Sequence, residues 1–583
     1  MDLDKRTVIA FLLIGLILVF MNTKYYQKIL YPNGIPERQS NFQEEKAEPQ
    51  NLPADDKSFD ETKIQSHYVQ QSEYVKEEEE KLIILESEVY RATLSNKGGA
   101  ILQWELKKFH KSDGGFVALF PEKAYGNLGI SFKNKINSEI FNTGNMVFHY
   151  EGPETLTVKE PIKLTFTLQL DDKKNIIKEY LFKPNQYDAG LTVYLNNLEE
   201  TIDEKRVIIS APNGLASNEK SLKDDMMYAK AGTAASGVIE KGYKTNGKPK
   251  RVTADFDWVA VRTKYFAFYL MPEIETIYDV EIIGEEIQLD DNPKDRWKKF
   301  GISIFYPYLG KKSDTIQMNL YLGPLEYDIL SSYKRDMEDF MDMGWKIIKP
   351  FSIGILAVFK WMHNFIPNYG IVLLLFAVII KVITYPLTQK SNKSMQKMQQ
   401  LQPKLLEIQE KYKNDPEKLN QMTMRLYKEA GVNPMSGCFP MLLQMPLLFA
   451  LFIVFRTTIE LRGQGFFAWI TDLSAPDSIY TFPGNFSLPL YGNSVNVLPI
   501  LMGITMYIQQ KMTVTDPKQK AMVYFMPIFF TILFNSFPSG LNLYYALFNL
   551  LSILQQKFLM PKIAPKTVET KILDDGRRKK SRK

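Results

Sequence analysis

Lys381 is the residue whose type and position point most directly to a function, because it is a cation within a long apolar segment. The segment from Tyr369 to Leu387 is long enough to cross a bilayer. A charge at the centre of a membrane helix costs about 3 kcal/mol on insertion scales, so such residues usually face a protein interior or a water-filled cavity. A second interpretation stays open from this segment alone. Leu387 lies about 9 Å from Lys381 along a helix, so the long side chain could snorkel to that interface.

A polar stripe is expected on the last apolar segment of the chain. Its members are spaced i, i+3, i+7 and i+10, which places them on one face of a helix: Asn542, Tyr545, Asn549 and Ser552. Three further polar residues complete the candidate substrate groove: Gln444, Gln510 and Tyr544. Each group alone is explained equally well as a hydrogen bond between helices. Together with Lys381 they are more polarity than packing demands, so we predict a hydrated concavity within the membrane.

The apolar segments that must position these residues predict a polytopic α-helical membrane domain with six transmembrane helices in total. The first is an uncleaved anchor within residues 1–32, and the others occupy about 367–388, 439–459, 495–512, 521–537 and 541–559. Residues 367–560 are therefore expected to form a five-helix core with a basic, cytoplasmic helical hairpin at 389–430. Basic and non-basic loops alternate along these spans, which predicts that both termini are cytoplasmic.

The segment between the anchor and the core predicts a separate extracytoplasmic domain. Residues 33–80 are rich in charged residues, Gln and Pro, so we expect a disordered linker that lets this domain move independently of the core. Residues 81–335 alternate apolar and polar positions, as at Leu164 and Phe166, which indicates an all-β sandwich, and the charge pattern of the loops places it outside the cytoplasm. Residues 343–366 have the spacing of an amphipathic helix lying in the membrane interface, although an ordinary domain-edge helix has the same pattern.

The composition argues against several kinds of site. The 583 residues include one cysteine, Cys438, so no intramolecular disulfide can form. The four histidines have no ligand spacing, and no phosphate-binding glycine loop or hydrolase motif is present. We therefore expect no metal, no cofactor and no catalytic residues; an enzyme is not excluded by the composition, but nothing in it indicates one.

The net charge of +6 is concentrated at the C-terminus. From Met560 to Lys583 there are nine Lys and Arg residues against three acidic ones. The basic tail, residues 561–583, is expected in the cytoplasm, where it would bind RNA or anionic lipid by counterion release. The alternative is a solvated tail that serves only as a topology signal.

The chain resembles the YidC/Oxa/Alb insertase family, most closely the Gram-negative type with a large periplasmic domain. In the membrane domain the resemblance is carried by an ordered series of motifs, which includes Tyr369-Gly370, Tyr385-Pro386-Leu387, Leu401-Gln402-Pro403, Val432-Asn433-Pro434, Gln444-Met445-Pro446, Glu460-Leu461-Arg462, Phe537-Pro538-Ser539-Gly540 and Leu543-Tyr544-Tyr545. Less specific fragments lie in the β domain, among them Gly98-Gly99, Lys264-Tyr265-Phe266 and Leu322-Gly323-Pro324.

The resemblance implies a protein that inserts nascent membrane proteins into the inner membrane through a hydrophilic cationic groove, alone or with the Sec translocon. Lys381 matches a position that is usually Arg. Lysine keeps the positive charge of arginine but lacks its planar guanidinium group. Phe548 replaces a usual small polar residue, so the groove is expected to be drier than is typical. The implied partners are nascent membrane proteins, the Sec translocon, membrane lipids, and ribosome and signal-recognition components at the hairpin and tail, with no DNA.

Two functions of other classes stay open from the residues alone. A small-solute or ion transporter would explain Lys381 and the polar stripe, but neither inverted repeats nor broken helices in both halves are visible. An envelope sensor that acts through the β domain would leave the intramembrane stripe without a purpose.

Overall fold

The computed structural model describes residues 78–112, 114–273, 278–289, 295–432, 439–483, 488, 491–513 and 520–559. The expected N-terminal anchor, most of the expected linker and the basic tail lie outside the described residues. The chain divides into two compact units, residues 1–67 with 514–525 and residues 68–513 with 526–583. The second unit holds the β-rich domain and nearly all of the helices that carry the candidate groove.

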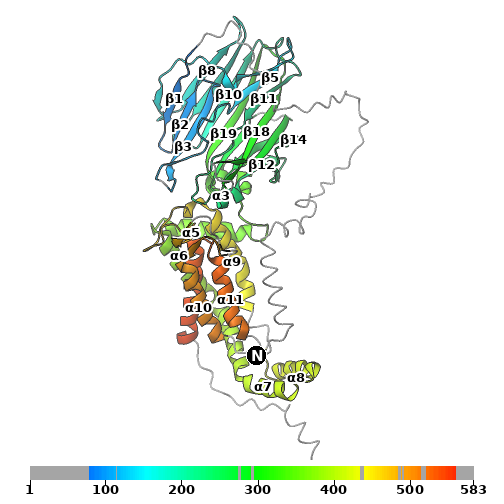
Figure 1. Cartoon of the computed structure of the whole chain (residues 1–583), viewed down its shortest axis with the longest axis vertical. Helices are drawn as coiled ribbons and strands as arrows, with labels where there is room; N and C mark the ends of the chain where they lie inside the picture. The colour runs from blue at the N-terminus through cyan, green and yellow to red at the C-terminus, as the bar shows by residue number, and fades with distance from the viewer. Residues whose placement is uncertain are drawn as a thin grey trace, which may run out of the picture. The chain divides into compact units, whose positions relative to one another are not determined.

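The β-rich domain is built from three sheets between residues 82 and 324, counted over the described strands (Figure 1). The first has the order β4 (Phe116–Ala118), β3 (Ala100–His110), β2 (Tyr90–Ser95), β1 (Leu82–Glu86) and β7 (Thr155–Thr157). The second has the order β13 (Val238–Glu240), β12 (Lys230–Ala235), β15 (Phe256–Arg262), β16 (Phe266–Pro272), β19 (Ser313–Pro324), β10 (Asp188–Asn196), β9 (Asn175–Phe182) and β8 (Ile162–Gln169). The third has the order β14 (Pro249–Ala254), β17 (Tyr278–Gln288), β18 (Arg296–Pro307), β11 (Arg206–Ala211), β5 (Gly129–Lys133) and β6 (Ile140–Asn142).

Alternation of apolar and polar residues determines which side of each strand is buried. In β9 and β10, which pair antiparallel, every second residue is buried, as the period-two pattern of the sequence predicts. The buried sides share one hydrophobic core whose largest members include the fully buried Trp104, Trp258 and Tyr269. The predicted β-rich domain is therefore confirmed.

The helices follow the β domain in the order expected from the apolar segments. They are α5 (Lys349–His363), α6 (Tyr369–Gln400), α7 (Gln402–Lys411), α8 (Pro416–Glu429), α9 (Phe439–Thr457), α10 (Val497–Thr513), α11 (Lys520–Phe534) and α12 (Ser539–Leu554), which ends in a π turn at Gln555–Leu559. Two short helices, α3 (Leu222–Tyr228) and α4 (Tyr327–Ser332), belong to the β domain, and a hairpin of β20 (Ser478–Thr481) and β21 (Ser494–Asn496) lies between α9 and α10.

Helix α6 begins where the sequence supplies an N-cap. The Asn368 side chain accepts a hydrogen bond of 3.1 Å from the backbone N–H of Ile371. Within the described residues, Tyr369–Pro386 is the stretch long and apolar enough to cross a membrane, and Gln444–Thr457 and Ala521–Phe534 form shorter apolar helices. Five helices thus lie at the five expected positions, while the total of six spans stays a prediction.

The helical part has a core of its own. Buried side chains from α6, α9, α10 and α12 meet there, among them Phe376, Phe455 and Tyr544. Helices α10 and α11 approach closely at Gly503, where an added Cβ would lie 2.0 Å from Thr531 Oγ1. A small residue at such a crossing is typical of helices packed in membranes.

Candidate functional site

Lys381 lies on α6 with its charged end against α12. Its Nζ donates a hydrogen bond of 2.5 Å to Ser552 Oγ and lies 4.2 Å from the centroid of the Phe548 ring. Ser552 and Phe548 are four residues apart on one helix, so they share a face. The ring face and the hydroxyl oxygen both stabilise an ammonium group. In the described part of the chain these are the contacts of the Lys381 ammonium group, and neither partner is a carboxylate.

The predicted stripe on α12 divides into parts with different partners. Asn549 Nδ2 donates to Thr505 Oγ1 of α10 at 3.4 Å, which places it at the contact between those helices. Asn542 Nδ2 donates to the backbone carbonyls of Phe534 and Phe537 at 3.1 and 3.4 Å. These carbonyls end α11 and form the following turn, so the donors of Asn542 fasten the α11–α12 turn. That Asn542 shares a concavity with Lys381 stays a prediction from the spacing.

Tyr545 is in the middle of the stripe, and Tyr544 precedes it on α12. Tyr544 and Tyr545 are buried, and neither hydroxyl has a hydrogen-bond partner among the described residues. The same is true of Asn542 Oδ1 and of Gln510 Oε1 on α10. Buried polar atoms nearly always have a partner, so each of these atoms is suited to bind water or a polar ligand.

The remaining predicted residues lie on neighbouring helices. Gln444 on α9 and Gln510 on α10 are both half-buried. Over the described residues, neither makes a hydrogen bond with Lys381, so the lysine and Ser552 are the predicted pair that the fold brings into contact. The same residues contain no group of three or more His, Cys, Asp or Glu side chains that could hold a metal ion.

Sequence reasoning missed part of this cluster. It treated Phe548 as a drier replacement and did not predict its ring as a partner of the ammonium group. It also missed the contact between Gln555 Nε2 and Thr388 Oγ1, at 3.4 Å, which joins the end of α12 to α6. The helical period contains the signal, because Gln555 follows Ser552 by three residues and Thr388 follows Lys381 by seven.

Large apolar side chains cover the outer faces of these helices. The exposed ones on α6, α10 and α11 include Val382, Ile383, Ile504, Ile508, Phe525 and Ile528. Exposed apolar surface of this extent is unusual in soluble proteins and suits contact with lipid. The site therefore combines a cation, Lys381, that has no carboxylate partner among the described residues, with several polar atoms and apolar surroundings.

Comparison with known proteins covers both parts of the chain. The family model described as 60Kd inner membrane protein matches residues 361–566, and the model described as YidC periplasmic domain matches residues 82–352. Proteins named membrane protein insertase YidC from Chlorobaculum parvum and Chlorobium phaeovibrioides are 37% and 38% identical, with 82% of this chain and 82% and 83% of theirs covered. The protein of that name from Chloroherpeton thalassium is 34% identical over 96% of both chains.

A solved structure described as an active YidC insertase is also similar. It is 20% identical, covers 82% of this chain and 94% of its own, and has a TM-score of 0.34. The two family models and the three relatives define the class as an inner-membrane protein with a periplasmic domain. Within that class, the chain belongs to the YidC family of membrane protein insertases.

Proposed function

We propose that this protein inserts nascent membrane proteins into the inner membrane through a polar, cationic groove formed by α6, α10 and α12. The observation that carries the proposal is Lys381, an ammonium group held by the Ser552 hydroxyl and the Phe548 ring. A charge at membrane depth without a carboxylate partner is costly, and such residues usually mark the path of a substrate. The matching substrate group is the acidic or polar flank of an inserting segment.

The groove would act by lowering a desolvation barrier. An unpaired carboxylate that enters an apolar medium loses its hydration at a cost of several kcal/mol. A nearby ammonium group and the buried polar atoms of Tyr544 and Tyr545 would offset part of that cost while the flank crosses. The apolar part of the substrate would then leave along the exposed apolar surface. No bond is made or broken, in keeping with a family of insertases that are not enzymes.

The proposal includes a topology. The N-terminal apolar segment and helices α6, α9, α10, α11 and α12 would form six spans, with both termini in the cytoplasm and the β domain in the periplasm. Helix α5 would lie in the membrane interface, because Phe351 and Trp361 are exposed on it while Ile355 and Phe359 are buried.

A photoreactive phenylalanine analogue tests the position of the groove. Placed at Phe548 or Tyr545, it should cross-link a stalled nascent membrane protein, because Phe548 contacts the Lys381 ammonium group and Tyr545 carries one of the unsatisfied hydroxyls. The matched controls are Leu550 and Leu554 on the same helix, which are 44% and 43% exposed. These two should give weaker cross-links, measured as the shifted band after irradiation of ribosome–nascent chain complexes. Stronger cross-links from the two leucines would place the substrate path on the other face of α12.

We further propose that the basic hairpin and tail contact ribosomal RNA or signal-recognition components, and that the protein also works with the Sec translocon. Helices α7 and α8 support the first part, because they pack on a small core of their own that includes Leu405, Ile408 and Leu426. Their charged residues therefore remain available at the surface.

Replacing the four basic residues from Arg577 to Lys580 with glutamine should weaken ribosome association, and more steeply as salt rises, because phosphate contacts release counterions. Co-sedimentation with ribosomes over a salt series measures the effect. The control replaces Asp574 and Asp575 with asparagine, which should not weaken association. Sedimentation unaffected by the glutamine substitutions at every salt concentration would reduce the tail to a topology signal.

A further inference from the structure

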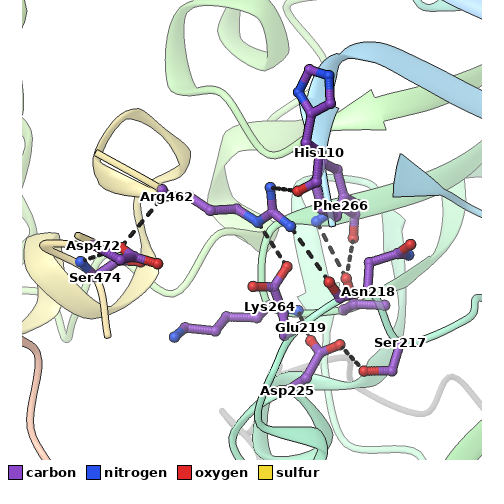
Figure 2. A network of polar contacts seen from close by, with 12 residues as sticks. His110, Ser217, Asn218, Glu219, Asp225, Lys264, Phe266, Arg462, Asp472 and Ser474 are labelled. Carbon is purple, nitrogen blue, oxygen red and sulfur yellow. Dashed lines mark hydrogen bonds and ion pairs between the residues drawn. The ribbon is translucent and has the colours of Figure 1, made fainter. Parts of the chain in front are cut away.

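Helix α9 ends at Thr457, and the side chain of Arg462, in the segment that follows, reaches into the β domain (Figure 2). Its Nε donates to Glu219 Oε1 at 2.8 Å, and its two terminal nitrogens donate to the backbone carbonyls of His110 at 2.9 Å and Asn218 at 3.5 Å. The arginine side chain is 9% exposed and that of Glu219 is 17% exposed. A guanidinium group that is this well enclosed and makes three directed hydrogen bonds has one favoured position.

Arg456, in the last turn of α9, makes a second ionic contact with the same part of the β domain. Its guanidinium donates to Asp224 Oδ1 at 2.9 Å, and Lys264 donates to the other oxygen of that carboxylate at 2.7 Å. Burial alone would raise the pKa of Asp224, but the two cations outweigh it and hold the pKa below its usual value. Asp224 lies in α3, whose neighbour Asp225 accepts from the backbone of Lys264 at 2.8 Å. The acidic segment is therefore itself fixed.

The segment that carries Arg462 is also joined to the start of α12. Asp472 accepts from the backbone N–H of Gly463 at 3.2 Å, which closes the loop behind the arginine (Figure 2). The backbone carbonyl of Asp472 accepts from Ser539 Oγ at 2.7 Å, and the carbonyl of Leu473 accepts from the N–H of Gly540 at 3.0 Å. Ser539 and Gly540 are the first two residues of α12, the helix that holds Phe548 and Ser552.

A third ionic contact involves Glu460, two residues before Arg462. Lys360 of α5 pairs with Glu326 at 3.2 Å and Asp328 at 2.5 Å in the segment that leads out of the β domain, and with Glu460 at 3.4 Å. Glu460 and Arg462 therefore connect the same short segment to two separate parts of the chain. These contacts favour a fixed position of the β domain on the helices, whereas the composition of the linker predicts independent motion.

We propose that Arg456 and Arg462 form an ionic clamp through which the β domain positions α9 and α12, so that the domain is a fixed part of the insertase. The route is continuous: acidic residues 219 and 224, the two arginines, the loop that ends at Leu473, and the first residues of α12. A ligand or partner held by the β domain would thereby act on the helices that carry the proposed groove.

A charge-reversal cycle tests the clamp without any substrate. In a Cys438→Ser background, spin labels on cysteines at Ile136 and Ile479, 80% and 58% exposed, report the distance between the β domain and the hairpin after α9. In Arg462→Glu or Glu219→Arg, the single narrow distribution of label-to-label distances should broaden, because each substitution places like charges in contact. The double variant Arg462→Glu/Glu219→Arg should narrow the distribution again in part, since the ion pair is restored while the bonds to the two carbonyls are not.

The control is Arg296→Glu, which breaks an exposed ion pair with Glu286 inside the β domain and should leave the distance narrow. Where Arg462→Glu does not accumulate, Arg462→Gln serves, since it removes the charge without reversing it. A distance distribution that stays narrow in both Arg462→Glu and Arg462→Gln would overturn the clamp. A double variant whose distribution is as broad as those of the single variants would also overturn it. Because the label distance is measured without a nascent chain, failure of the clamp is distinguishable from failure of the insertase proposal, which the cross-links at Phe548 test.

Discussion

Lys381→Glu should reduce insertion of substrates with acidic translocated segments more than any other single change in the groove. At 4 Å and an effective dielectric constant of 20, two unit charges interact by about 4 kcal/mol, and the substitution turns that attraction into repulsion. A moving substrate is less well placed than a fixed pair, so we expect a loss of about a hundredfold for Lys381→Glu and about tenfold for Lys381→Ala, since about 1.4 kcal/mol corresponds to a tenfold change in rate. Lys381→Arg should retain most activity, because it keeps the charge.

The measurement is the initial rate of protease-protected insertion into vesicles, with an acidic substrate and a variant of it in which the acids are amides. The difference between the Lys381 variants should shrink for the amide substrate. Lys511→Ala, at the end of α10, is the matched control and should insert both substrates normally. Equal rates for the lysine, alanine and glutamate forms would mean that Lys381 only snorkels.

The helical elements could be predicted from the sequence because their signal is local. Long apolar runs predicted where α6, α9, α10, α11 and α12 begin to within a few residues, but α6 continues to Gln400, well beyond the expected end of its span at about 388. The sequence Asn414-Asp415-Pro416 lies at the break between α7 and α8, as turn-forming residues should. The break is where Asp415 caps α8 through a 3.1 Å hydrogen bond from the backbone of Lys418. Period-two alternation likewise predicted the β-rich domain.

The contacts of the site could be predicted only in part, because they depend on which helix faces are neighbours. Helical spacing placed Asn542 and Ser552 on one face, yet one fastens a turn and the other holds the lysine. The curvature and crossing angles of the helices determine which residues of a face meet a given neighbour, and the periodicity of a single helix does not predict either. The pairing of Arg462 with Glu219, 243 residues apart, has no local signal at all.

Lys178, which is fully buried in the β domain, also makes long-range contacts that no local sequence pattern predicts. Its Nζ donates to the backbone carbonyls of Gly98 and Leu128, both at 2.6 Å, and to that of Gly99 at 3.5 Å. Gly98 and Leu128 have φ of +75° and +63°, conformations that the lysine helps to hold. The alternation of β9 alone would have assigned this position to an apolar residue.

Lys178→Glu should destabilise the β domain by about 3–5 kcal/mol, because it places an unpaired carboxylate against three carbonyl oxygens in a buried site. Urea unfolding of the fragment 78–340, followed by tryptophan fluorescence, measures the change; the fragment contains nearly all of the buried residues of the β-domain core. Lys163→Met is the matched control, since Lys163 on the adjacent β8 is exposed and pairs with Glu179 at the surface. It should change stability by less than about 1 kcal/mol.

The same lysine should also give the β domain a distinctive pH dependence. Burial lowers the pKa of Lys178 from 10.5 to about 7. Below about pH 7 the folded and unfolded states are both protonated, so the cost of burying the charge is constant there. Between the two pKa values the unfolded state binds the extra proton, so the free energy of unfolding should rise with pH, by up to about 1.4 kcal/mol per unit. Lys178→Met removes this group, so its unfolding free energy should lack that rise; parallel curves for the two proteins from pH 7 to 10 would show that the buried lysine keeps its ordinary pKa.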